Sequence, residues 1–126
     1  MNPEAGDSGA DDLKKRNMSE TMYRASRVLR VLASPTAYLI VRALIGAKLT
    51  PSELSATLGV PAATVSGTLR HLREVDIVSY EAAGKHKTYW LKDGSVGAIL
   101  ELVEAWVDRM RRRARLFDGA DGAEGA

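Results

Sequence analysis

The most informative absence in this chain is cysteine. Its 126 residues contain none, so disulfides, thiolate redox sensing and thiolate–metal sites are excluded. Long hydrophobic runs are missing as well, because the longest apolar stretches fall far short of the ~20 residues that a membrane span needs. The first residues are acidic and glycine-rich, unlike the basic start and apolar run of a signal peptide. We therefore expect a cytoplasmic protein without a membrane partner.

Basic residues are absent from both ends of the chain. Residues 1–12 carry four acidic side chains and residues 118–126 carry three, whereas neither segment has Lys or Arg. The stretch 13–117 therefore holds 18 basic against nine acidic side chains, a net charge of +9. We expect one folded domain over 19–117, between disordered polar tails at 1–18 and 118–126. A basic body of this size suits a polyanionic partner.

Apolar spacing and capping residues predict a mainly α-helical fold. Ser19 can cap a first helix, and Pro35 suits the first turn of a second. Thr50–Glu53 is a capping box that opens a short third helix, and Gly59–Pro61 separates that helix from a fourth. The predicted helices cover residues 19–33, 35–46, 51–58, 62–74 and 95–116.

Two runs of strand-forming residues, Ile77–Tyr80 and Lys87–Leu91, lie between the fourth and the last helix. They predict a two-stranded hairpin whose tip is Gly84–Lys87. A helix, a tight Gly-containing break, a second helix and a basic-tipped hairpin together indicate a winged helix-turn-helix, which binds DNA. The competing interpretation of the hairpin is an ordinary solvated loop.

Several segments of this pattern also resemble a known protein family. They are Leu32–Pro35, Glu53–Val60, Thr64–Ser66, Leu69–Glu74 and the end of the hairpin, Tyr89–Leu91. They look like the ArsR (SmtB) family of bacterial and archaeal repressors, over about residues 19–110. The resemblance implies a winged helix-turn-helix fold and homodimers that pair through the first and last helices. It also implies a near-palindromic double-stranded DNA operator.

The fourth helix is then expected to enter the major groove, with the hairpin cations on phosphate. The candidate DNA-binding residues are Ala62, Ala63, Thr64, Ser66, Gly67, Thr68 and Arg70 on the helix, and Lys85, His86 and Lys87 on the hairpin. Gly67 either allows close approach of DNA or is simply tolerated in the helix. His71 suits a surface or packing role better than a DNA contact.

The metal sites that are common in the family are missing from this chain. Thr50 and Ser52 stand where many members carry cysteines, and no histidine follows His86 to supply ligands on the last helix. We therefore expect no metal and no cofactor. The expected signal is a small-molecule or anionic effector, a partner protein, or no ligand at all.

Apolar stripes on the first and last helices predict a homodimer. The candidate interface residues are Met22, Leu29, Val103, Trp106 and Met110. The arginines of 109–115 favour the C-terminal end of a helix, where they are solvated by default. They also suit phosphate, an acidic partner or an anionic effector.

The expected function is a sequence-specific, DNA-binding transcriptional regulator, a homodimeric repressor released by a non-metal signal. No Ser-His-Asp set, P-loop or dinucleotide fingerprint occurs, so an enzyme is not expected. The alternatives are a winged-helix module for protein contact and a sequence-indifferent architectural DNA binder. Salt-dependent preference for an operator over random DNA separates the three.

Overall fold

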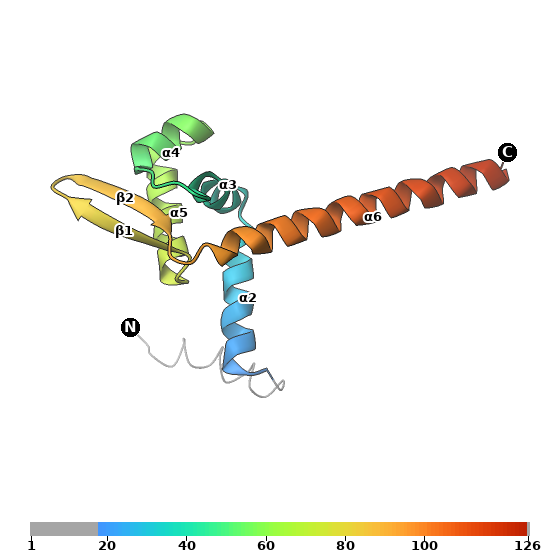
Figure 1. Ribbon diagram of the computed structural model, residues 1–126, viewed down its shortest axis with the longest axis horizontal. Coiled ribbons are helices and arrows are strands. Elements are labelled where there is room, and N and C mark those ends of the chain that lie inside the picture. The colour runs from blue at the N-terminus through green and yellow to red at the C-terminus, as the bar shows by residue number, and fades with distance from the viewer. Residues whose placement is uncertain (1–17, 126) are drawn as a thin grey trace. The chain divides into compact units, whose positions relative to one another are not determined.

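The computed structural model describes residues 18–125, with side chains described up to residue 118. Within these residues, five helices and a two-stranded sheet follow one another in the order α2, α3, α4, α5, β1, β2 and α6 (Figure 1). The chain divides into two compact units between Asp93 and Gly94. The predicted tail at 1–18 lies outside the described residues, except for Met18. The observed elements are those of the predicted winged helix-turn-helix.

Serine side chains start the first two helices, α2 (Glu20–Leu32) and α3 (Pro35–Leu44). The hydroxyls of Ser19 and Ser34 each accept a hydrogen bond from the amide three residues ahead, at 3.1 and 3.4 Å. These bonds satisfy amides that have no partner inside the helix. α3 ends two residues earlier than predicted, because Ile45 adopts an extended backbone with ψ of 114°.

The helix pair α4 (Pro51–Leu58) and α5 (Ala62–Glu74) has the predicted boundaries. The Thr50 hydroxyl accepts from the Glu53 amide at 3.1 Å, and the Glu53 carboxylate accepts from the Thr50 amide at 3.0 Å. This reciprocal capping box sets the start of α4. Gly59 ends α4 in the left-handed conformation, with φ of 66°. That conformation suits glycine, which has no Cβ to clash.

The hairpin consists of β1 (Val78–Ala83) and β2 (His86–Leu91), which pair antiparallel along their whole length. Both strands extend farther toward the tip than predicted. His86 therefore belongs to β2 and not to the connection, whereas Lys87 lies in β2 as the predicted strand Lys87–Leu91 had it. The correction follows from the turn, which has only two residues and begins at Gly84 with φ of 63°. A turn this short brings the flanking residues directly into register.

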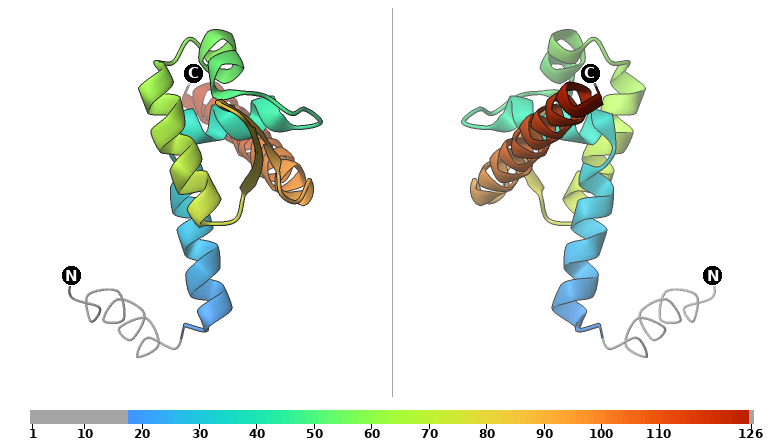
Figure 2. Two further views of the ribbon diagram at one scale, coloured as in Figure 1. Left: turned by 90° about the vertical axis from the view of Figure 1, so that its left-hand side faces the viewer. Right: turned by 90° about the vertical axis from the view of Figure 1, so that its right-hand side faces the viewer.

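The core of the first unit lies among α3, α4, α5 and the hairpin, where α5 leads through a short turn into β1 (Figure 2). No polar or charged side chain is buried among the described residues. The buried core side chains of this unit are Leu32, Ala37, Ile40, Val41, Leu44, Leu54, Val65, Leu69, Leu72, Ile77, Val78 and Tyr89. This core orients α5 and the hairpin.

The second unit is the 31-residue helix α6 (Ser95–Gly125), which is about 46 Å long at 1.5 Å per residue. It continues past the predicted end near Leu116 and includes most of the segment 118–126, which the sequence predicts to be disordered. The segment lacks proline and contains alanines, so nothing in it forces the helix to stop. Between residues 101 and 118, no side chain of α6 is buried.

None of the helices in the described part of the chain combines the length and the apolar content that crossing a membrane requires.

Candidate nucleic-acid interface

The second helix of the helix-turn-helix, α5, turns one face toward the core and the opposite face outward. Its buried residues are Val65, Leu69 and Leu72. Beside the buried stripe, Ser66, Arg70 and Arg73 are all exposed, and their spacing of four and three residues places them in one row. α5 therefore presents a hydroxyl and two guanidinium groups along a single line.

The predicted residues of α5 reach solvent to different degrees. Ala62, Ala63, Thr64, Ser66 and Arg70 are exposed, whereas Gly67 and Thr68 are partly covered. The Thr68 hydroxyl donates a hydrogen bond to the Thr64 carbonyl at 2.8 Å. Because that proton is used inside the helix, Thr68 offers DNA a lone pair and a methyl group.

Gly67 does not serve packing within the chain. A Cβ placed on it would meet no other atom within 4 Å, and its φ is not positive. Two explanations remain for this glycine. Either DNA approaches α5 closely at this point, or the glycine is simply tolerated in the helix.

The wing residues Lys85, His86 and Lys87 are exposed at the end of the hairpin. Lys85 lies in the turn itself, whereas His86 and Lys87 are paired with Ala83 and Ala82 in the sheet. Backbone pairing makes the position of Lys87 better defined than a loop residue would be.

A cluster of rings and cations joins α5 to the hairpin. The Tyr80 and Tyr89 rings are cross-strand partners with centroids 5.3 Å apart. The Arg73 guanidinium and the Lys87 ammonium each lie 5.1 Å from the Tyr80 ring centroid. We call Arg73, Tyr80, Lys87 and Tyr89 the Tyr80 cluster. It links one cation of the helix to one cation of the wing.

Tyr89 anchors this cluster to the body of the protein. Its backbone amide and carbonyl both hydrogen-bond to Leu49, at 2.8 and 3.0 Å, and its side chain is buried. Burial raises the pKa of the Tyr89 hydroxyl, and the nearby Arg73 charge opposes that rise. The hydroxyl therefore stays protonated at neutral pH.

Arg73, Tyr80 and Lys48 are not among the residues predicted from the sequence. Arg73 was recognisable from its spacing, since it follows Ser66 and Arg70 at helical intervals. Lys48 lies 4.9 Å from the Trp90 ring centroid and adds a further cation beside the hairpin. The contacts of Arg73 with Tyr80 and of Lys48 with Trp90 depend on how the hairpin folds back. No local motif in the sequence therefore reveals them.

His71 is exposed on α5, 3.8 Å from the Glu74 carboxylate, which agrees with the predicted surface role. Across the described residues, no three His, Asp or Glu side chains gather closely enough to hold a metal ion.

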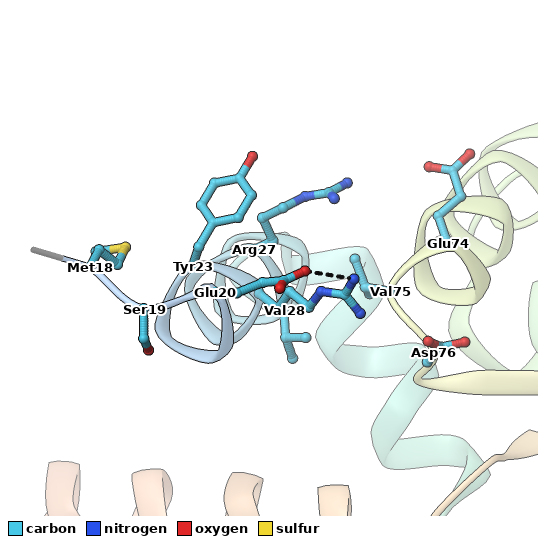
Figure 3. Close-up of a pocket in the computed structure, with 10 residues that line it drawn as sticks. Met18, Ser19, Glu20, Tyr23, Arg27, Val28, Glu74, Val75 and Asp76 are labelled. Atoms are coloured by element: carbon cyan, nitrogen blue, oxygen red, sulfur yellow. Dashed lines mark ion pairs between the residues drawn. The ribbon is translucent and has the colours of Figure 1, made fainter. Parts of the chain in front are cut away.

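A groove of about 540 Å³ lies between α2 and the turn that follows α5 (Figure 3). Tyr23 and Arg27 project from α2, while Glu74 and Asp76 lie on the other side. Arg24 is also in the lining, and it is paired with Glu20 at 3.0 Å. The groove thus combines one aromatic ring with charges of both signs.

The predicted dimer residues present large apolar surfaces. Met22 and Leu29 on α2 are 55% and 56% exposed, and Val103 and Trp106 on α6 are 46% and 55% exposed. Met110 is partly covered. These exposed apolar side chains form the candidate contact surface.

A family model described as a helix-turn-helix domain matches residues 32–81, from the end of α2 into β1. No curated protein matches the chain. Among solved structures, HlyU from Vibrio cholerae is 25% identical with a TM-score of 0.63, and the match covers 71% of this chain and 97% of HlyU. The chain contains a helix-turn-helix domain and has a winged helix-turn-helix fold.

Two further solved structures have the same fold as this chain. The transcriptional repressor BigR from Xylella fastidiosa is 23% identical with a TM-score of 0.61, and the match covers 76% of this chain and 93% of BigR. The homodimeric winged helix-turn-helix DNA-binding domain Mb0332 from Mycobacterium bovis is 19% identical with a TM-score of 0.66, covering 74% and 86%.

The winged helix-turn-helix fold gives two elements of this chain their usual names. α5 is the recognition helix and the β1–β2 hairpin is the wing. The matched domain and fold are those of DNA-binding transcription regulators and not of enzymes. HlyU is matched over nearly its whole length, yet more than a quarter of this chain lies outside that match.

Proposed function

We propose that this regulator is a homodimeric repressor that binds a specific double-stranded DNA operator in the cytoplasm and is released by a non-metal signal. The observation that carries the proposal is the exposed row Ser66, Arg70 and Arg73 on α5, beside the wing cations Lys85 and Lys87. A major-groove helix next to cationic side chains combines contacts to base edges with contacts to phosphate. BigR, a structural neighbour, is a transcriptional repressor.

The contacts divide into two kinds. Thr64, Ser66 and the Thr68 methyl group reach base edges, while the lysines and His86 of the wing lie against phosphate. Hydroxyls are short and Ala62 and Ala63 offer only methyl groups. DNA shape and water bridges therefore supply much of the discrimination.

Homodimerisation is proposed through α2 and α6. The support is the exposure of the dimer residues given above, together with the homodimeric state of Mb0332. A two-fold dimer covers identical apolar faces with each other and presents two recognition helices to a near-palindromic operator. The proposed DNA-binding and dimerisation domain is 19–117, and the acidic segments at each end of the chain lie outside it.

The proposed signal is a small-molecule or anionic effector, and neither a metal nor a cofactor is required. The groove of Figure 3 supports this proposal, because it offers the Tyr23 ring and the Arg27 guanidinium to a polar molecule. Its other wall, Glu74–Asp76, is the end of the recognition helix and the turn that follows it. A molecule bound there contacts the end of α5 directly.

The test is a competition binding assay with DNA from the region upstream of the protein's own gene. We expect the protein to protect an imperfect inverted repeat and to prefer it over random duplex by at least about a thousandfold at physiological salt. Adding the protein to an in vitro transcription reaction should lower the yield of transcript. Equal affinity for all sequences would favour the architectural binder, and no DNA binding would favour the protein-contact module.

Arg70 is the longest donor near the centre of α5, so its role decides how much of the operator is recognised directly. Arg70→Ala is assayed against operators with one base pair changed at a time. Relaxed preference at one position would identify a base contact, worth about 1–3 kcal/mol. A uniform loss across all sequences would identify a phosphate contact instead.

A further inference from the structure

The Tyr80 cluster has a rigid base and a cationic outer layer. Tyr89 is buried and is fixed by its two backbone hydrogen bonds to Leu49. The Tyr80 ring rests on Tyr89 across the strand pair, with centroids 5.3 Å apart and planes at 31°. Tyr80 is only partly covered, so one side of the ring remains available at the surface.

Arg73 and Lys87 use this ring from two different elements. Since each charge lies 5.1 Å from the same centroid, the two charges are no more than about 10 Å apart, a distance comparable to the screening length at 0.1 M salt. Both side chains are exposed, and neither has an ion-pair partner among the residues that the structure describes. Two positive charges held this close, with no anion between them, favour the binding of an anion.

We propose that Tyr80 is a positioning residue that holds Arg73 of the recognition helix and Lys87 of the wing as a pair for the phosphates of one DNA strand. The inference rests on the proposed DNA binding and adds Arg73 as a contact residue and Tyr80 as its organiser. The ring attracts each cation through its π face. The ring therefore restricts the rotamers of both long side chains before DNA binds. The conformational entropy that they lose on binding is then smaller.

The Tyr80 ring connects the two elements of the proposed DNA interface. Arg73 belongs to the helix that contacts base edges, and Lys87 belongs to the hairpin that contacts the backbone. A ring shared by both fixes the wing relative to the recognition helix. Removing the ring therefore weakens the phosphate contacts of both elements at once.

The experiment measures binding of the full chain to a random-sequence 25-base-pair duplex and to the upstream DNA, over a series of KCl concentrations. Tyr80→Leu removes the ring, whereas Tyr80→Phe keeps it. We expect Tyr80→Leu to lower affinity for both duplexes about three- to tenfold and to reduce the salt slope by about one unit. Tyr80→Phe should bind as the unchanged protein does. Tyr80→Phe is therefore the matched control for loss of the ring.

A double-mutant cycle separates positioning from a general loss of structure. Arg73→Ala and Tyr80→Leu should be strongly non-additive, because both remove the same contact, while Arg70→Ala and Tyr80→Leu should be additive. Unchanged binding by Tyr80→Leu, failure of Tyr80→Phe to restore it, or additivity with Arg73→Ala would each overturn the inference. If the unchanged protein binds neither duplex, the proposed function itself is wrong.

Discussion

The α5–hairpin region and α6 differ in where their apolar side chains go. In α5, Leu69 and Leu72 are fully buried within the first unit. On α6, Leu102, Trp106 and Phe117 are 70%, 55% and 73% exposed. One chain therefore organises the proposed DNA-binding surface by itself, whereas these apolar side chains of the long helix are left exposed in one chain. The two regions should respond differently to mutation and to protein concentration.

The charges of α6 strengthen this contrast. An apolar row of Val103, Val107, Met110, Ala114 and Phe117 continues at helical spacing through the basic part of the helix. The arginines flank this row or lie opposite it, and they are exposed. The face that would pair with another helix thus continues past the end that the sequence predicted near residue 116.

The largest effect is expected from a charge at Trp106, an exposed apolar side chain beside the apolar row of α6. Trp106→Glu should abolish dimerisation, because a carboxylate would be buried without a partner. Sedimentation should then show the 13.6 kDa chain and not twice that mass. Operator affinity should fall about a hundredfold when the two half-sites are no longer bound together. Glu101→Gln, on the opposite side of α6, is the control; a variant Trp106→Glu that remains dimeric would contradict the contrast.

A core substitution in α5 should have the next largest effect. Leu69→Ala is expected to lower the free energy of unfolding by about 2–5 kcal/mol, because it leaves a cavity in a fully buried site. Urea unfolding followed by circular dichroism measures this loss, which should be the same at every protein concentration. Val103→Ala on α6 should instead lower the unfolding midpoint by an amount that depends on concentration. If the effects of both variants on unfolding depended on protein concentration in the same way, the α5–hairpin region and α6 would not differ as proposed.

The boundaries of the helix-turn-helix could be predicted because local residues decide them. The capping box at Thr50–Glu53 and the left-handed Gly59 act within a few residues of the chain. The start of α2 is set in the same way by the Ser19 hydroxyl. Such signals do not depend on the rest of the fold.

The contacts between elements could not be predicted from local residues. Arg73 meets Tyr80 only because the hairpin folds back beside α5, and Tyr89 is fixed by Leu49, which lies 40 positions earlier in the chain. The hairpin also pairs Ala82 and Ala83, which have little strand propensity of their own, because the turn at Gly84 brings them into register. The end of α6 was misplaced because the glycine-rich composition of 118–126 predicted disorder, whereas the helix continues to Gly125.

The two wing lysines, Lys85 and Lys87, differ in how firmly the hairpin holds them. Lys85 lies in the turn, whereas Lys87 is held in β2 over the Tyr80 ring. Each change to Ala should weaken operator and random duplex alike and lower the salt slope by about one unit. Lys87→Ala should cost more affinity than Lys85→Ala, because Lys87 is already ordered before DNA arrives. A salt titration of both variants measures the difference, and a change in base preference would count against a phosphate role.

The smallest expected effect is also the one in which stability and binding move in opposite directions. Gly67 lies on the outward face of α5, one helical turn after Ala63 and just before Arg70, and a Cβ there meets nothing in the chain within 4 Å. Gly67→Ala should therefore stabilise the fold by up to about 1 kcal/mol through helix propensity alone. The same methyl group would stand between α5 and a DNA surface that approaches closely, so we expect operator affinity to fall several-fold while the unfolding midpoint rises. Gly94→Ala, at another glycine with open space around it, should leave binding unchanged. If Gly67→Ala stabilises the protein and binds the operator equally well, the glycine is only tolerated and DNA does not approach α5 closely at this point.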